Sequence, residues 1–227
     1  MIFLSKWIND WKPSLKINES NGEFTFRLYN NSLNKIPVKN VIDIGCCIGD
    51  TIAMFEKSFC PENIYGFDPD ENNCKESKKR CPRANIINSA VSNYDGENKL
   101  FISHANCGHS FYSNNKDQPS KIVNTIRMDT WARLNNISNF DFVKIDTEGN
   151  DLKVLDGFGD YINLIKILRV ELAFNDTVFP GASLFYEIIK YLEDRSLKFY
   201  NFVTLSHRDN ARLYWGDALF LRSDILL

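Results

Sequence analysis

The chain has 227 residues, of which 44% are hydrophobic and 25% charged, and its formal net charge is −2. This length suffices for one α/β domain with a real core. The near balance of charge excludes a disordered chain and gives no positive field that would favour DNA or RNA as a partner. The apolar start lacks the features of a signal peptide, and no apolar run approaches the roughly 20 residues that span a bilayer. We therefore expect a cytoplasmic protein without a membrane span.

Residues 1–37 are expected to form an N-terminal extension, in which alternating polar and apolar residues over 23–29 predict a half-buried strand. Residues 38–227 contain no internal repeat and no linker rich in glycine, serine or proline. We expect them to form a single domain.

Strands and helices alternate through this domain, which predicts a mostly parallel sheet with helices on both faces. The predicted strands cover residues 40–44, 63–68, 85–88, 140–146, 165–172, 199–205 and 218–221. The predicted helices cover residues 51–59, 71–80, 129–134 and 183–195, and another begins at 151.

An insertion is predicted between the third and fourth of these strands. Asp95-Gly96 is a hairpin signal, and residues 99–103 are expected to form one arm of an added β-ribbon. Residues 104–120 have no clear period and contain two of the three histidines. They are the candidate for a mobile loop that contacts the substrate.

Six cysteines occur without any Cys-x-x-Cys pair. This spacing does not predict a zinc site, and a chain of this size needs no disulfide to fold. We expect free thiols, with a bridge between Cys60 and Cys81 as the alternative. The cysteines are Cys46, Cys47, Cys60, Cys74, Cys81 and Cys107.

The first informative motif is an apolar run that ends in a glycine turn, from Gly45 to Gly49. A helix and a second apolar run follow, and this second run ends at Asp68. Strand, glycine turn, helix and strand with a terminal acid are typical of a nucleotide-binding βαβ unit. Gly45 would let a ligand approach the backbone, and Asp68 would accept hydrogen bonds from a ribose.

The residues around this turn favour one cofactor over another. The dinucleotide fingerprint has a second glycine where this chain has Cys47, and that glycine lets the backbone approach a pyrophosphate. Asp43 and Asp50 flank the turn and would repel phosphate. S-adenosylmethionine carries a cationic sulfonium and ammonium and no phosphate, so the acids suit it better than NAD. An ordinary turn without a ligand is the alternative.

A second acidic motif follows the strand predicted at 140–146, where Asp146 and Glu148 lie at the carboxyl end. In open α/β sheets ligands bind at that edge. The two carboxylates could orient a hydroxyl and accept its proton, or attract the positive end of the cofactor. Alternatively they only cap the next helix together with Asp151.

Five blocks in register resemble the FkbM family of S-adenosylmethionine-dependent methyltransferases over residues 41–171. Lys144-Ile145-Asp146-Thr147-Glu148-Gly149 is similar to its Lys-Ile-Asp-Val-Glu-Gly block, and Asp43-Ile44-Gly45-Cys46-Cys47-Ile48-Gly49 to its Asp-Ile-Gly-Ala-Asn-Ile-Gly turn. Phe67-Asp68-Pro69 resembles its Phe-Glu-Pro. The segments that begin at Ser89 and Met128 resemble two further blocks.

The resemblance implies a Rossmann-like class I methyltransferase fold with seven strands, the last antiparallel. It also implies methyl transfer to oxygen, commonly on a sugar or a secondary metabolite. By position, the turn would shape the methionine side of the pocket, Asp68 would bind the ribose, and Ser89 and Ala90 would lie near the adenine. The residues expected to bind the cofactor are Asp43, Gly45, Cys46, Gly49, Asp50, Thr51, Asp68, Pro69, Ser89 and Ala90.

Methyl transfer from a sulfonium is an in-line displacement, and a base helps because a protonated hydroxyl is a poor nucleophile. Asp146 or Glu148 is the first choice of base, and His109 is the alternative. A divalent metal held by Asp146 with Glu171 or Asn175 is a less favoured variant, so we expect no metal.

The expected partner is a small-molecule or glycan acceptor and no nucleic acid. Two other functions remain open at this point. One is a non-catalytic ligand-binding or scaffold protein on a methyltransferase fold, and the other is a nicotinamide-dependent oxidoreductase.

Overall fold

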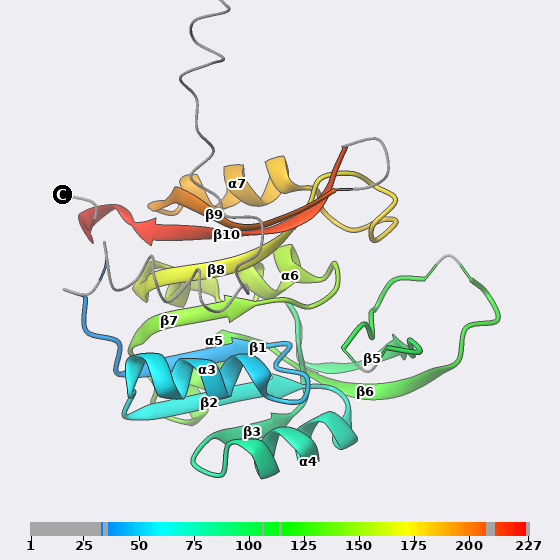
Figure 1. Cartoon of the computed structure of the whole chain (residues 1–227), viewed down its shortest axis with the longest axis horizontal. Helices are drawn as coiled ribbons and strands as arrows, with labels where there is room; N and C mark the ends of the chain where they lie inside the picture. The colour runs from blue at the N-terminus through cyan, green and yellow to red at the C-terminus, as the bar shows by residue number, and fades with distance from the viewer. Residues whose placement is uncertain (1–32, 34–35, 106, 114, 208–211, 226–227) are drawn as a thin grey trace, which may run out of the picture. The chain divides into compact units, whose positions relative to one another are not determined.

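The computed structural model describes residues 33, 36–105, 107–113, 115–207 and 212–225. The chain divides into two compact units, residues 1–34 and residues 35–227. The strand predicted at 23–29 lies outside the described residues, as does most of the first unit. The described part of the second unit contains a seven-stranded sheet and a three-stranded sheet (Figure 1).

The large sheet has the strand order β3-β2-β1-β7-β8-β10-β9. Strands β1, β2, β3, β7 and β8 are parallel, whereas β10 runs antiparallel to both β8 and β9. The predicted sheet with an antiparallel last strand is confirmed. The bounds are β1 Asn40–Ile44, β2 Asn63–Asp68, β3 Asn85–Asn88, β7 Phe140–Ile145, β8 Ile165–Ala173, β9 Leu197–His207 and β10 Leu213–Arg222.

Helices cover both faces of this sheet, with α3 and α6 on opposite sides (Figure 1). All five predicted helices are present. None of the helices among the described residues is long and apolar enough to cross a membrane. The bounds are α3 Asp50–Phe59, α4 Glu71–Arg80, α5 Met128–Leu134, α6 Asp151–Asp156 and α7 Phe185–Glu193, with 3-10 turns at η2 Gly159–Leu164 and η3 Ser223–Ile225.

Burial on both faces explains why the central strands read as apolar runs. All six residues of β7 are buried. Val143 joins the main core with the buried residues of α5, α6 and α7. Phe142 points to the other face, where its ring lies 4.8 Å from that of Phe55 in α3. Lys144 follows Phe142 with the two-residue period of a strand and therefore lies on the α3 face.

The small sheet has the order β4-β6-β5, formed by β4 Ala90–Val91, β6 Ser120–Ile126 and β5 Gly96–Phe101. The added β-ribbon is confirmed, but the hairpin predicted at Asp95-Gly96 is wrong. Strands β4 and β5 flank β6 and do not pair with each other. Asp95 instead accepts hydrogen bonds from the Arg127 N–H at 2.7 Å and the Thr130 hydroxyl at 2.8 Å, next to the start of α5.

Candidate active site

A pocket with about 510 Å³ of empty space lies at the carboxyl ends of β1, β2, β3 and β7. This position is where open α/β sheets bind ligands. The pocket is lined by Ile44, Gly45, Phe67, Pro69, Ser89, Ala90, Val91, Leu100, Cys107, His109, Phe111, Asp146, Thr147, Glu148 and Asn150.

The structure brings part of the predicted site to this pocket. The three candidate bases Asp146, Glu148 and His109 all line it. Of the ten residues expected to bind the cofactor, the lining includes Gly45, Pro69, Ser89 and Ala90. The other six lie behind the wall or elsewhere on the turn. They are Asp43, Cys46, Gly49, Asp50, Thr51 and Asp68.

Gly45 forms the point where the ends of β1 and β7 meet. Its φ is +81°, and a Cβ at this position would lie 1.8 Å from the carbonyl oxygen of Asp146. The Gly45 and Cys46 N–H groups both donate to the Phe67 carbonyl, at 2.9 and 3.0 Å. A side chain here would therefore push apart the strand ends that form the pocket floor.

Asp68 organises the turn from behind the wall. Its carboxylate accepts hydrogen bonds from the N–H of Cys47 at 2.9 Å, the N–H of Asp70 at 2.8 Å and the Asn73 amide at 3.3 Å. Burial raises the pKa of Asp68 to about 6, although these hydrogen bonds lower it. A carboxylate has about four acceptor positions, so three donors leave room for a further one.

Asp43, which we expected to help shape the cofactor site, is not among the residues that line the pocket. It faces Lys144 across the β1–β7 register and is fully buried. Lys144 Nζ lies 3.3 Å from Asp43 Oδ1 and 3.2 Å from Asp146 Oδ2. Burial raises the pKa of Asp43 despite the lysine. For Lys144, burial acts to lower the pKa, but the charges of Asp146 and Asp43 outweigh it and raise it.

Several further acidic side chains lie close to Asp146. Burial, followed by the charges of Asp146 and Asp151, raises the pKa of Glu148 to about 8. Glu171 at the end of β8 is buried, and burial and the neighbouring acids raise its pKa well above the ordinary value. Asp151 Oδ1 accepts from both the Thr147 N–H and hydroxyl at 2.9 Å, which holds the loop before α6, and the N-cap Asn150 makes no side-chain hydrogen bond to the first turn of this helix. Asp146 and Glu148 are left facing the pocket.

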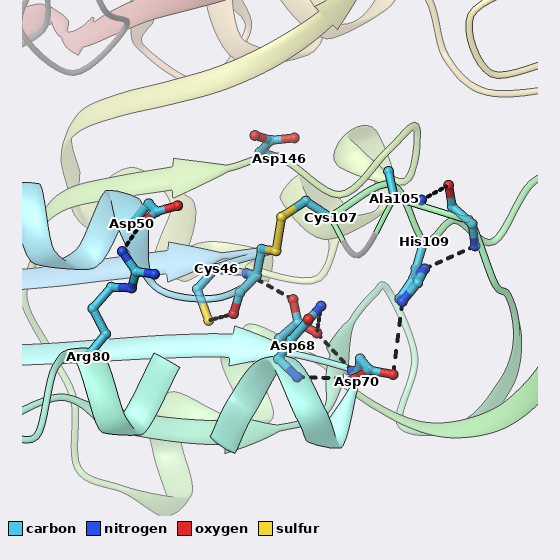
Figure 2. The surroundings of a disulfide bond; sticks show 12 residues. Cys46, Asp50, Asp68, Asp70, Arg80, Ala105, Cys107, His109 and Asp146 are labelled. Atoms are coloured by element: carbon cyan, nitrogen blue, oxygen red, sulfur yellow. Dashed lines mark hydrogen bonds and ion pairs between the residues drawn. A yellow bond between two sulfur atoms is a disulfide. The ribbon is translucent and has the colours of Figure 1, made fainter. Parts of the chain in front are cut away.

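Two turn residues have other partners. Asp50 forms an ion pair with Arg80 of α4, away from the pocket (Figure 2). Cys46 is buried and packs with Ile52 and Ile64 on the α3 side of the sheet. Neither is among the residues that line the pocket.

His109 lines the pocket with both ring nitrogens engaged. Its Nδ1 accepts a hydrogen bond from the Ser103 N–H at 3.0 Å, and its Nε2 lies 4.0 Å from Asp70 Oδ2 (Figure 2). In the neutral ring the proton therefore sits on Nε2, and the lone pair of Nδ1 is occupied. Burial lowers the pKa of His109. This arrangement makes His109 a wall residue and argues against it as the base.

A disulfide joins Cys47 of the glycine turn to Cys107 in the pocket wall (Figure 2). The prediction that all cysteines are free is wrong for this pair. The alternative bridge is also wrong, because Cys60 and Cys81 are both free thiols. The fold brings Cys47 and Cys107 together across 60 residues, which the cysteine spacing could not indicate.

Sequence reasoning missed the walls that the insertion provides. Cys107 and Phe111 belong to the loop predicted to contact a substrate, but no pattern singled them out. Leu100 comes from β5, and Asn150 follows the acidic motif. Among the described residues no group of three or more histidine, cysteine or acidic side chains is arranged to hold a metal ion.

The comparison with protein families agrees with this geometry. The model described as "Methyltransferase FkbM domain" matches residues 43–199, which is more than half of the chain. The chain belongs to the FkbM methyltransferase family. The cofactor of this FkbM domain is S-adenosylmethionine. A search of curated proteins finds no match.

Solved structures show the same fold at low sequence identity. Magnesium protoporphyrin IX methyltransferase (ChlM) from Synechocystis PCC 6803, with bound SAH, has a TM-score of 0.52 and 12% identity over 98% of this chain and 95% of that one. TrmK from M. capricolum, in complex with S-adenosyl-homocysteine, has a TM-score of 0.51 and 11% identity over 91% of this chain and 69% of that one. An rRNA methylase from Streptococcus thermophilus has a TM-score of 0.50 and 9% identity over 93% of this chain and 99% of that one.

Proposed function

We propose that this FkbM domain transfers a methyl group from S-adenosylmethionine to a hydroxyl oxygen of a small-molecule or glycan acceptor. The observation that carries the proposal is the shared pocket. Asp146 and Glu148 line the same cavity as Gly45, Pro69 and Ser89, which come from the family's cofactor blocks. Carboxylates and nucleotide-side residues therefore meet at one site.

The residues present fit this cofactor by charge and shape. Asp146 offers negative charge to a sulfonium or ammonium group, and a cation bound there would favour the charged form of Glu148, whose pKa is raised to about 8. Phe67, Ala90 and Leu100 offer apolar walls to the adenine. Asp68 retains an acceptor position for a ribose hydroxyl, although a small movement of the turn is needed because Asp68 is only 6% exposed.

S-adenosylmethionine supplies an electrophilic methyl group whose bond to sulfur breaks as the acceptor oxygen attacks. The task of the chain is alignment and proton removal. Glu148 is our choice for the proton acceptor, because its raised pKa of about 8 makes its carboxylate a stronger base than an ordinary one. Asp146 would then orient the hydroxyl, with its own position set by Lys144 at 3.2 Å.

The nicotinamide alternative is disfavoured by Cys47. Where a dinucleotide site has a glycine, this chain has a side chain in a disulfide, which occupies space that a pyrophosphate would need. The non-catalytic alternative differs from our proposal only in turnover. We further propose a cytoplasmic location and an acceptor other than nucleic acid, since the net charge of −2 provides no general attraction to phosphates.

Two measurements test the proposal. Calorimetry should show micromolar binding of S-adenosylmethionine and S-adenosylhomocysteine and no binding of NADH. Acceptors that carry hydroxyl groups are then screened by release of S-adenosylhomocysteine, with Glu148→Gln as the matched variant. Transfer by the wild type and its loss in the variant would support the proposal. Cofactor binding without transfer to any hydroxyl compound would favour the non-catalytic alternative.

A further inference from the structure

Residues 107–113, which we call the wall segment, form one side of the cofactor pocket. Cys107, His109 and Phe111 from this segment line the cavity. The segment comes from the insertion between β5 and β6 and not from the sheet that carries the family motifs. What holds it in place therefore decides the shape of the pocket.

Noncovalent bonds hold the wall segment at Ser110. The Ser110 hydroxyl donates to the Glu148 carbonyl at 2.6 Å, and its backbone pairs with Phe101 at 2.8 and 3.2 Å. At the start of the segment, the Cys107 disulfide provides a covalent attachment to Cys47. The Cys47 N–H in turn donates to Asp68 Oδ2 at 2.9 Å. The disulfide thus ties the wall to the turn and, through one hydrogen bond, to the predicted ribose ligand.

The environment of the six cysteines makes this pair the natural place for thiol–disulfide exchange. Cys107 is exposed, so an external thiolate can reach its sulfur. Cys46, Cys74 and Cys81 are buried. Burial raises the pKa of all three thiols, to about 11 for Cys74, so they stay protonated and do not compete in exchange.

We propose that Cys47 and Cys107 form a reversible redox modification site whose reaction partner is a dithiol, and whose oxidation state sets how firmly the pocket holds the cofactor. The inference rests on the proposed cofactor site. Reducing compartments keep such pairs as thiols and oxidising ones keep them bridged, so the state follows the surrounding thiol pool.

The exchange is a balanced two-electron step. One thiolate of the dithiol attacks Cys107 Sγ, the disulfide breaks, and Cys47 leaves as a thiolate that takes up a proton. The second thiol of the dithiol then attacks the mixed disulfide and releases Cys107 as a thiol. The two cysteines gain two electrons and two protons, and the dithiol is oxidised to its own disulfide.

The expected consequence follows from preorganisation. With the disulfide closed, the wall is already in position when the cofactor binds. With the cysteines reduced, binding must also order the first residues of the wall segment, which weakens affinity. We expect reduction to raise the Kd for S-adenosylhomocysteine about tenfold, mainly through faster release.

The test compares the same protein in both states, prepared with glutathione disulfide or with dithiothreitol. Alkylation of the denatured protein followed by mass spectrometry should count four free thiols in the oxidised form and six in the reduced form. Calorimetry and stopped-flow measurements then give the Kd and release rate for S-adenosylhomocysteine. Cys107→Ser should behave as the reduced form in both buffers. Cys60→Ser, which removes an exposed free thiol, should respond as the wild type does.

A tenfold difference that disappears in Cys107→Ser would support the inference. Equal affinity and release rate in the two states would overturn it and leave the proposed function intact. A count of six thiols after oxidation would also overturn it, since no bridge would have formed. If neither state binds S-adenosylhomocysteine, the proposed function itself fails, and the coupling fails with it.

Discussion

Replacing Lys144 by Met tests the buried ion pair between the turn and the catalytic edge. The change removes the cation that is ion-paired with the fully buried Asp43 carboxylate. At 3.3 Å and an effective dielectric constant of about 20, two unit charges attract by about 5 kcal/mol. Removing one partner of a buried pair costs roughly 3–5 kcal/mol in proteins. We expect Lys144→Met to lower the free energy of unfolding by that amount, measured by urea denaturation.

The double variant Asp43→Asn with Lys144→Met is the control. It removes both buried charges, so most of the lost stability should return, because replacing a whole buried pair by neutral groups is often nearly neutral. An equal loss of stability in the single and double variants would refute the reasoning. The contribution of Lys144 would then come from packing of its side chain and not from its charge.

The pH dependence of stability tests independently whether the buried Asp43 carboxylate is destabilising. Burial raises the pKa of Asp43, so the folded state binds this proton more readily than the unfolded state does. The cost of the buried carboxylate is therefore full above its folded pKa and disappears as the pH falls below the ordinary value of 3.8. Without Lys144 the pKa of Asp43 should rise further. The stability deficit of Lys144→Met should therefore grow as the pH rises above 3.8, and the double variant should lack this trend.

Three further predictions concern the pocket. Asp68→Ala should raise the Kd for S-adenosylhomocysteine in calorimetry by about 10- to 150-fold, since a hydrogen bond to a charged group contributes about 1.5–3 kcal/mol; unchanged affinity would remove the ribose assignment. Because the pKa of Glu148 is about 8, turnover should rise as the pH increases through 8, and Glu148→Gln should abolish that limb of the pH–rate profile. Gly45→Ala should abolish cofactor binding and lower the melting temperature, because the new Cβ would lie 1.8 Å from the Asp146 carbonyl oxygen.

The sequence predicted the sheet and the edge that carries the site, because both depend on local patterns. Apolar runs identified the strands, and the carboxyl ends of parallel strands share one edge. Gly45, Asp146 and Glu148 therefore came together at the pocket as their positions indicated. The fold class and the cofactor could also be predicted, since the motifs follow one another in the family's order.

Partners that depend on strand register or on loop placement were not predictable. Asp43 and Lys144 are about one hundred residues apart, and only the parallel pairing of β1 with β7 places them opposite each other. Cys47 and Cys107 meet because an aperiodic loop folds over the glycine turn. For His109, the sequence showed a histidine within the candidate substrate loop, but not that both ring nitrogens face partners.

Asp43, the acid of the glycine-turn motif, has a different role in the structure from the one that its motif indicated. Asp43 does not line the pocket, yet it pairs with Lys144, and Lys144 in turn contacts Asp146 in the pocket. One buried cation thus joins the family's two acidic blocks. Beyond Asp146 the described residues add Glu148, Asp151 and Glu171, whose pKa values burial raises. A cation bound at this edge would favour the charged form of these carboxyl groups, whereas a phosphate would oppose it, so the arrangement supports the same cofactor as the family does.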